Sequence, residues 1–197
     1  PGTPGPVVRA RATGPGASRP RRGGRAALSP SRAKDFMQCP LLFRLRTVDR
    51  IPDPGSLATH KGTLVHGVLE RLYDLPPRER TREAARAMLP SQWETHREKS
   101  PDVMGLFDDP TRVAPWLEEA GALLDAYFRM EDPTRLEPAE RELLVQTETR
   151  DGLLLRGFVD RLDVAPDGAM RVVDYKTGRS PGPRFQAEAL FQMRFYA

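Results

Sequence analysis

Two neighbouring segments near the C-terminal end of the sequence carry charged side chains at a spacing that could bind a metal ion. Asp174 and Lys176 are two residues apart in an apolar run, and Asp160 lies in an earlier run of similar character. Because side chains alternate between the two faces of a strand, Asp174 and Lys176 are expected on the same face. A carboxylate and an ammonium group placed there can hold a metal ion and a water molecule beside it.

The turn between the two segments decides whether Asp160 joins this pair. With a two-residue turn, Asp160 lies opposite Tyr175, and the two aspartates point to opposite faces. With a three-residue turn over 166–168 and Gly168 in the left-handed region, Asp160 lies directly opposite Asp174. Opposed Cβ atoms are about 4.5–5.5 Å apart, so these carboxylates would repel each other unless a cation such as Mg²⁺ lay between them. We predict the three-residue turn, although the same charges would also suit ordinary exposed strand positions.

The hydrophobic pattern indicates which elements position these residues. Apolar residues with a period of two predict an antiparallel meander of three strands at 143–149, 153–164 and 170–176. Helical spacing predicts helices at 31–38, 63–75, 81–89, 115–130 and 185–197. Residues 50–61 are predicted to form a loop, and residues 91–115 to be irregular. The chain is therefore expected to be α/β.

Composition limits the class of protein. A chain of 197 residues suits one domain. Residues 1–27 hold six Arg and no acidic residue, which leaves a net charge of −2, the difference between +4 and +6, on the other 170 residues. The basic total is thus no argument for nucleic-acid binding, and this Arg/Gly/Pro-rich tail is predicted to be disordered. No apolar run has the length of a membrane span and the start lacks a secretory signal, so we expect a cytoplasmic protein without a membrane partner.

Five motifs in register resemble the RecB-type exonuclease group of the PD-(D/E)XK nuclease superfamily. In chain order they are Ser29-Pro30-Ser31 with Cys39-Pro40 and Phe43, Gly62-Thr63-x-x-His66, Gly157-x-x-Asp160-Arg161-x-Asp163, Asp174-Tyr175-Lys176-Thr177-Gly178, and Gln192-x-x-x-Tyr196-Ala197. They cover residues 28–197, the expected nuclease domain. The resemblance implies a restriction-endonuclease-like core, in which a mixed sheet containing the meander is flanked by helices and preceded by a helical insertion.

The resemblance also implies a ligand set for a divalent metal ion. Asp160 and Asp174 correspond to the metal-binding carboxylates of the group, and the ion would be Mg²⁺ or Mn²⁺. His66 corresponds to an additional ligand from an N-terminal helix, and the carbonyl of Tyr175 is a further candidate. Without the motif, His66 would be read as a packed core residue, because it borders an apolar helical stripe.

Further roles follow from the same resemblance. Lys176 corresponds to the residue that orients or deprotonates the attacking water, and it is one of only four Lys among 31 basic residues. A compact ammonium group can tune its pKa, whereas a guanidinium group cannot. Gln192 and Tyr196, at positions i and i+4 of the last predicted helix, correspond to a pair that contacts the active site or the DNA backbone.

Cys39 lies in the Cys-Pro context in which some members of the group hold one ligand of a [4Fe–4S] cluster. The resemblance places the other three cysteines near the C-terminus. Since such a cluster takes four thiolates, Cys39, the single cysteine of the sequence, could ligate it only in a longer parent chain. The sequence stops at Ala197 within a predicted helix, so we expect the nuclease domain to be truncated.

The resemblance implies a metal-dependent DNA exonuclease that acts in recombination or repair, with DNA as substrate and a helicase or recombination protein as a possible partner. The alternative is a nuclease-like module that binds DNA or serves as a scaffold without cleaving it. The presence of Asp160, Asp174 and Lys176 together favours cleavage, because a module without activity has no chemical need for all three.

Overall fold

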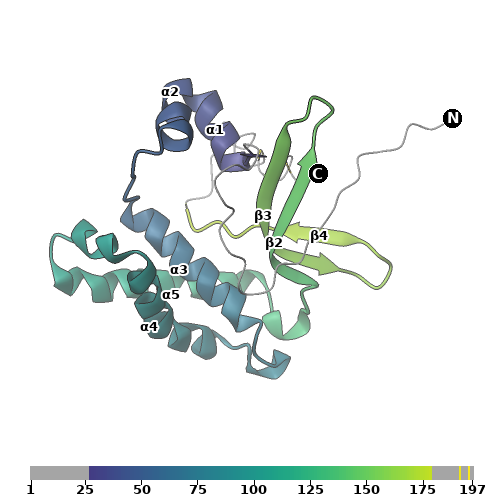
Figure 1. The fold of residues 1–197 in the computed structure, drawn as a ribbon. Coiled ribbons are helices and arrows are strands. Elements are labelled where there is room, and N and C mark those ends of the chain that lie inside the picture. The colour runs from purple at the N-terminus through teal and green to yellow at the C-terminus, as the bar shows by residue number, and fades with distance from the viewer. Residues whose placement is uncertain (1–26, 179–190, 192–194, 196–197) are drawn as a thin grey trace.

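The sheet is organised around β3 (Leu154–Val164), which pairs with each of the other strands in the part of the chain that the structure describes. The computed structural model describes residues 27–178, 191 and 195. β2 (Glu140–Glu148) runs antiparallel to β3. β1 (Ala27–Leu28) pairs in parallel with the start of β3, and β4 (Met170–Val173) pairs antiparallel with its end. The sheet is therefore mixed and contains the predicted meander (Figure 1).

The turn between β3 and β4 has the predicted three-residue form. Ala165 N–H donates to the carbonyl of Ala169 at 2.8 Å, and Gly168 has a φ of +85°. The ladder pairs Arg161 with Val173, and the same register continued by one residue places Asp160 opposite Asp174. The register predicted from the turn is thus confirmed.

β4 is shorter than the predicted strand 170–176. It ends at Val173, and two residues later the N–H of Tyr175 donates to the side chain of Asp160 at 2.6 Å. The backbone of Tyr175 is therefore bound by a carboxylate of the neighbouring strand instead of by a backbone carbonyl. This departure from the ladder occurs at the residues that carry the predicted chemistry.

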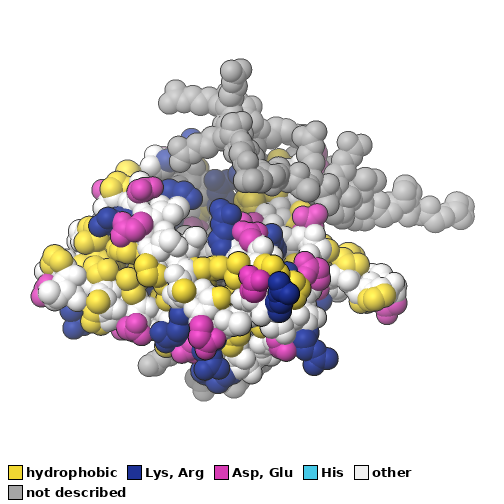
Figure 2. Space-filling view, turned by 90° about the horizontal axis from the view of Figure 1, so that it is seen from below, with side chains coloured by type: hydrophobic (Ala, Val, Ile, Leu, Met, Phe, Trp, Pro, Cys, Tyr) yellow, Lys and Arg dark blue, Asp and Glu magenta, His cyan; other side chains and the backbone are white. Residues whose placement is uncertain are grey.

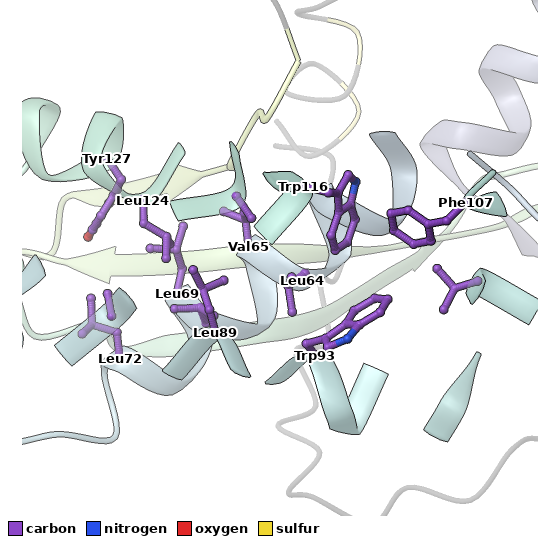
Figure 3. Close-up of a cluster of buried hydrophobic side chains, with 14 residues drawn as sticks. Leu64, Val65, Leu69, Leu72, Leu89, Trp93, Phe107, Trp116, Leu124 and Tyr127 are labelled. Carbon is purple, nitrogen blue, oxygen red and sulfur yellow. The ribbon is translucent and has the colours of Figure 1, made fainter. Parts of the chain in front are cut away.

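Three long helices pack together beside the sheet (Figure 1). They are α3 (Leu57–Leu72), α4 (Arg82–Lys99) and α5 (Val113–Met130). Their apolar faces, together with Val103 and Phe107 from the segment between α4 and α5, form a core of 14 buried residues, in which Trp93, Trp116 and Phe107 are grouped at one end (Figure 3). None of the helices in the described part of the chain is long and apolar enough to cross a membrane.

Two helix boundaries differ from the sequence prediction. α3 begins at Leu57, not at residue 63, because the side chain of Ser56 accepts a hydrogen bond from Thr59 N–H and caps the helix. The predicted loop 50–61 therefore ends five residues early, at Ser56. α4 does not stop near residue 89 but continues past Pro90 to Lys99. Its core-facing side chains recur every four residues and end with the buried Trp93, so packing outweighs the proline.

Shorter elements complete the described fold. α1 (Pro30–Gln38) begins, as predicted, with a Ser29 cap and a proline in the first turn, and it ends before Cys39. It is followed by α2 (Pro40–Phe43) and a π-helical turn (Arg44–Val48). Four 3₁₀ turns span Pro77–Glu79, Pro101–Leu106, Pro110–Arg112 and Pro133–Arg135. The predicted helix 185–197 and the predicted tail 1–27 lie outside the described residues, apart from Ala27, Phe191 and Phe195.

Candidate metal centre

Three carboxylates form a row across the three strands of the meander. In the β2–β3 ladder the pairs on either side of Glu142 set this residue opposite Asp160. The β3–β4 register, continued one residue beyond the end of β4, sets Asp174 on the other side of Asp160. Glu142 has a φ of +47°, which is uncommon for a residue with a side chain and marks a local departure from the strand. Such departures cluster at functional sites. Both the backbone geometry and the gathered negative charge therefore indicate that the row is a functional site.

His66 of α3 closes this row from the helical side. Its Nε2 lies 2.8 Å from the carbonyl oxygen of Tyr175, and its Nδ1 lies 3.5 Å from Oδ1 of Asp160. Because a carbonyl oxygen can only accept, Nε2 carries the hydrogen in this contact. In neutral His66 the lone pair of Nδ1 therefore faces a carboxylate oxygen. Two acceptors so placed need a proton or a metal ion between them.

Within the described residues, one set of possible metal ligands meets at this point. A ligand atom each of His66, Glu142 and Asp160 can be chosen so that all lie within 4.8 Å of one another. Asp174 stands beside this set and forms an ion pair with Lys176. Carboxylate oxygens are the ligands that Mg²⁺ and Mn²⁺ prefer, and a protein carbonyl and an imidazole are compatible additions. The donor set therefore fits a divalent cation.

The electrostatics of the centre indicate an excess of negative charge. Burial, followed by the charges of Asp160 and Glu70, raises the pKa of Glu142. Burial also raises the pKa of Asp174, although the hydrogen bond to Lys176 opposes it. For His66, burial lowers the pKa, but the hydrogen bond and charge of Asp160 outweigh burial and raise it. All three shifts favour protonation, as expected where carboxylates are gathered without a compensating cation.

Lys176 and Asp174 differ in their access to solvent. The side chain of Lys176 is 60% exposed, whereas that of Asp174 is 9% exposed. The ammonium group thus reaches from the partly buried row toward solvent, where a substrate would approach. This placement agrees with the expectation that Asp174 and Lys176 share a face of the strand.

The buried side chain of Arg161 holds Tyr175, the residue between Asp174 and Lys176, in place. Arg161 is fully buried and donates to Glu131 and Asp163, and to the hydroxyls of Tyr73 and Tyr175 at 2.8 and 3.0 Å. Burial would lower the pKa of Arg161, but its hydrogen bond to Glu131 and the other partners raise it. Arg161 is therefore charged, and it holds the ring of Tyr175 from the core side.

The structure brings together four of the residues singled out in the sequence. His66 contacts the carbonyl of Tyr175 and Asp160 accepts from its N–H, while Asp174 and Lys176, on either side of Tyr175, form an ion pair. Cys39 is partly buried and caps the C-terminal end of α1. Gln192 and Tyr196 lie outside the described residues.

Glu142 was missed by the sequence analysis. The predicted strand began at residue 143, whereas β2 begins at Glu140, so Glu142 was left outside the sheet. The turn between β2 and β3 contained the missing signal: Gly152 has a φ of +79°, and Thr149 N–H donates to the carbonyl of Leu153. A register counted back from that turn sets Glu142 against Asp160.

A family model described as the PD-(D/E)XK nuclease superfamily matches residues 27–197. The chain belongs to this superfamily. PD-(D/E)XK nucleases hydrolyse nucleic acids and usually use divalent metal ions, and the centre around Asp160 supplies a fitting donor set. The mixed sheet flanked by helices agrees with the restriction-endonuclease-like fold that the sequence motifs implied.

Two phage proteins are similar in sequence to this PD-(D/E)XK chain. The Gene 69 protein of Mycobacterium phage D29 is 27% identical over 190 residues, which cover 80% of this chain and 65% of the phage protein. The Gene 69 protein of Mycobacterium phage L5 is 56% identical over 36 residues, which cover 18% of this chain and 12% of that protein. The chain thus spans less than two thirds of the length of the D29 protein.

Proposed function

We propose that this PD-(D/E)XK chain is a RecB-type, Mg²⁺- or Mn²⁺-dependent DNA exonuclease that acts in the cytoplasm in recombination or repair. The observation that carries the proposal is the row Glu142–Asp160–Asp174 with His66 at its side. A helicase or recombination protein is the proposed partner. In a longer parent chain, Cys39 would contribute one thiolate to a [4Fe–4S] cluster.

In this proposal the metal ion is held by Asp160, Glu142 and His66, with Asp174 and the carbonyl of Tyr175 as further ligands. When bound, such an ion polarises a phosphodiester and lowers the pKa of water. Burial, followed for both residues at a lower rank by the charge of Asp160, raises the pKa values of Glu142 and Asp174, and a bound cation would favour the ionised form of each carboxylate.

The chain's own residues position the reactants. Lys176, paired with Asp174, orients or deprotonates the attacking water and offsets the negative charge that develops on the phosphate. In the hydrolysis, the oxygen of water forms a bond to phosphorus and the bond from phosphorus to the leaving oxygen breaks. The proton that water loses passes to a base at the site, and the leaving oxygen gains a proton. Gln192 and Tyr196 are proposed to contact the active site or the DNA backbone.

The carboxylate row also argues against a module that only binds DNA. Carboxylates placed side by side repel one another and lower stability in the absence of a cation. A scaffold that binds the phosphate backbone gains nothing from negative charge at that position. The cost is explained if the row holds a metal ion for hydrolysis.

The proposal is tested with end-labelled linear DNA and closed circular DNA, each incubated with Mg²⁺ or Mn²⁺ and with EDTA. We expect release of nucleotides from linear DNA only, in the presence of metal only. Asp160→Asn should abolish release, whereas Asp167→Asn, in the turn after β3, should retain it. Release in EDTA, or full activity of Asp160→Asn, would contradict the metal centre. Cleavage of circular DNA would contradict the exonuclease assignment.

A further inference from the structure

A cleft between α3 and α4 leads into the candidate metal centre. Its volume is about 690 Å³, and its lining includes Glu142 and His66 of the centre together with residues of both helices. The two helices pack against each other in the helical layer (Figure 1). The cleft is thus continuous with the site of the proposed hydrolysis, but most of its lining has no role in that chemistry.

The wall formed by α4 consists of polar side chains on one helix face. Gln92, Thr95, His96 and Lys99 line the cleft, and their spacing of i, i+3, i+4 and i+7 places them on a single face. They offer an amide, a hydroxyl, an imidazole and an ammonium group. These are the groups that proteins use to contact phosphates and sugars of nucleic acids.

Glycines of α3 allow close contacts along the opposite wall. A Cβ atom on Gly67 would lie 3.2 Å from Oε1 of Gln92, and one on Gly62 would lie 3.0 Å from Oγ1 of Thr177. Glycine within a helix costs about 1 kcal/mol relative to alanine. Here the cost is explained by the close approach of α3 to Gln92 in the cleft and to Thr177 beside the metal centre.

A histidine pair fixes the α4 wall. Nδ1 of His60 lies 2.8 Å from Nε2 of His96, and Nε2 of His60 donates to the carbonyl of Pro54. With that hydrogen on Nε2, Nδ1 of neutral His60 accepts from His96. Burial, followed by the electrostatic effects of His60 and Lys99, lowers the pKa of His96, so His96 is neutral near pH 7. The wall is therefore held in place before any ligand binds.

The cleft suits a strand and not a duplex. Its volume lies within the range of about 300–1,000 Å³ found for pockets that enclose one small ligand. A B-DNA duplex is much larger, since its major groove alone is about 12 Å wide. The cleft lining holds both basic and acidic side chains, Arg71 and Lys99 with Glu70 and Glu142, and they are likewise interspersed on the face shown in Figure 2.

We propose that the α3–α4 cleft binds a single DNA strand and guides its backbone to the metal centre, with Lys99 on a phosphate and Gln92 and Thr95 on the adjoining sugar or phosphate. This inference rests on the proposed nuclease function and deepens it by naming the form of DNA that is bound. The strand runs along α4 to Glu142 and His66, which line the same cleft.

The test measures binding of a fluorescent single-stranded oligothymidylate by anisotropy, in EDTA, so that no cleavage is needed. Lys99→Glu is compared with Arg97→Glu, which makes the same charge change on the same helix at a residue that does not line the cleft and is paired with Glu94. We expect Lys99→Glu to weaken binding at least about threefold more than Arg97→Glu. The slope of log K against log salt should fall by about 0.7 for the lost phosphate contact. Thermal unfolding of both variants establishes that they fold equally well.

The outcomes separate this inference from the nuclease proposal. Three results would overturn the cleft assignment, even if the chain cleaves DNA. They are equal weakening of binding by the two variants, absence of oligonucleotide binding, and equal competition by a blunt duplex that contains the same sequence. Selective weakening by Lys99→Glu, in a chain that cleaves no DNA with any metal, would support the cleft while the proposed hydrolysis failed. Thr95→Glu provides a second cleft variant, which should weaken binding in the same way.

Discussion

Replacement of Arg161 tests whether the buried cluster beneath the metal centre stabilises the nuclease domain. Arg161→Met keeps most of the side-chain volume but removes the charge that Glu131 and Asp163 share in the core. It also removes the donor to the hydroxyls of Tyr73 and Tyr175. With the longer contact to the hydroxyl of Tyr127 at 3.4 Å, the substitution therefore leaves two carboxylates and three hydroxyls without their common partner.

The expected loss of stability is about 3 kcal/mol. Removal of one partner of a buried ion pair costs about 3–5 kcal/mol. The low end applies here because Glu131 and Asp163 are 20% and 17% exposed and both remain in contact with Arg171. For a domain of this size, about 3 kcal/mol corresponds to a decrease in melting temperature of roughly 6–12 °C.

Arg171→Met is the matched control. Arg171 contacts the same two carboxylates, but its side chain is 54% exposed, so its loss should cost less than about 1 kcal/mol. Urea unfolding in EDTA at fixed pH measures both variants without interference from a bound metal ion. Equal losses in the two variants would show that burial of Arg161 contributes nothing beyond its charge, and the reasoning would be wrong.

Three further predictions concern the centre and its turn. Glu142→Gln should leave metal-free stability unchanged or higher at neutral pH and should reduce the rise in melting temperature caused by Mg²⁺, whereas Glu148→Gln, at the other end of β2, should do neither. Because the pKa of Glu142 is raised in the folded state, the folded state binds a proton more readily than the unfolded state does. The stability of the unmodified chain relative to Glu142→Gln should therefore increase as the pH falls from neutral toward about 4.5. Urea unfolding across that pH range measures this difference. Lys176→Arg should lower the cleavage rate by at least about tenfold, because a guanidinium group keeps the charge but cannot tune its pKa. A rate near that of the unmodified chain would show that Lys176 contributes only its positive charge. Gly168→Val should cost about 1–2 kcal/mol through its positive φ alone, and Gly105→Val, equally open but without a positive φ, should cost clearly less.

The register of the site could be predicted because it follows from local rules. A glycine in the left-handed region closes a three-residue turn, and strand alternation then fixes every side chain between Asp160 and Asp174. These effects act within about fifteen residues of sequence, so tertiary packing did not have to be known. The prediction succeeded for the residues where turn chemistry and hydrophobic period agree.

Other parts of the fold depend on contacts that the sequence does not display. The continuation of α4 beyond Pro90 is due to burial of Trp93 against α5 and the turn at Phe107, and these partners lie 14 or more residues away in the sequence. Glu142 joins the centre only through its register with Asp160. The cleft of Gln92 and Lys99 could not be found before α4 was known to extend to residue 99.

Tyr175 links the buried cluster to the metal centre. Its hydroxyl accepts from Arg161 in the core, its carbonyl accepts from His66, and its N–H donates to Asp160. Strand alternation explains why an aromatic residue separates two charged ones: the side chains of Asp174 and Lys176 face the site, and that of Tyr175 packs into the core. The apolar core and the row of carboxylates therefore share one peptide segment. A substitution such as Arg161→Met should consequently impair cleavage as well as stability, because Arg161 holds the hydroxyl of Tyr175, the residue whose backbone contacts His66 and Asp160.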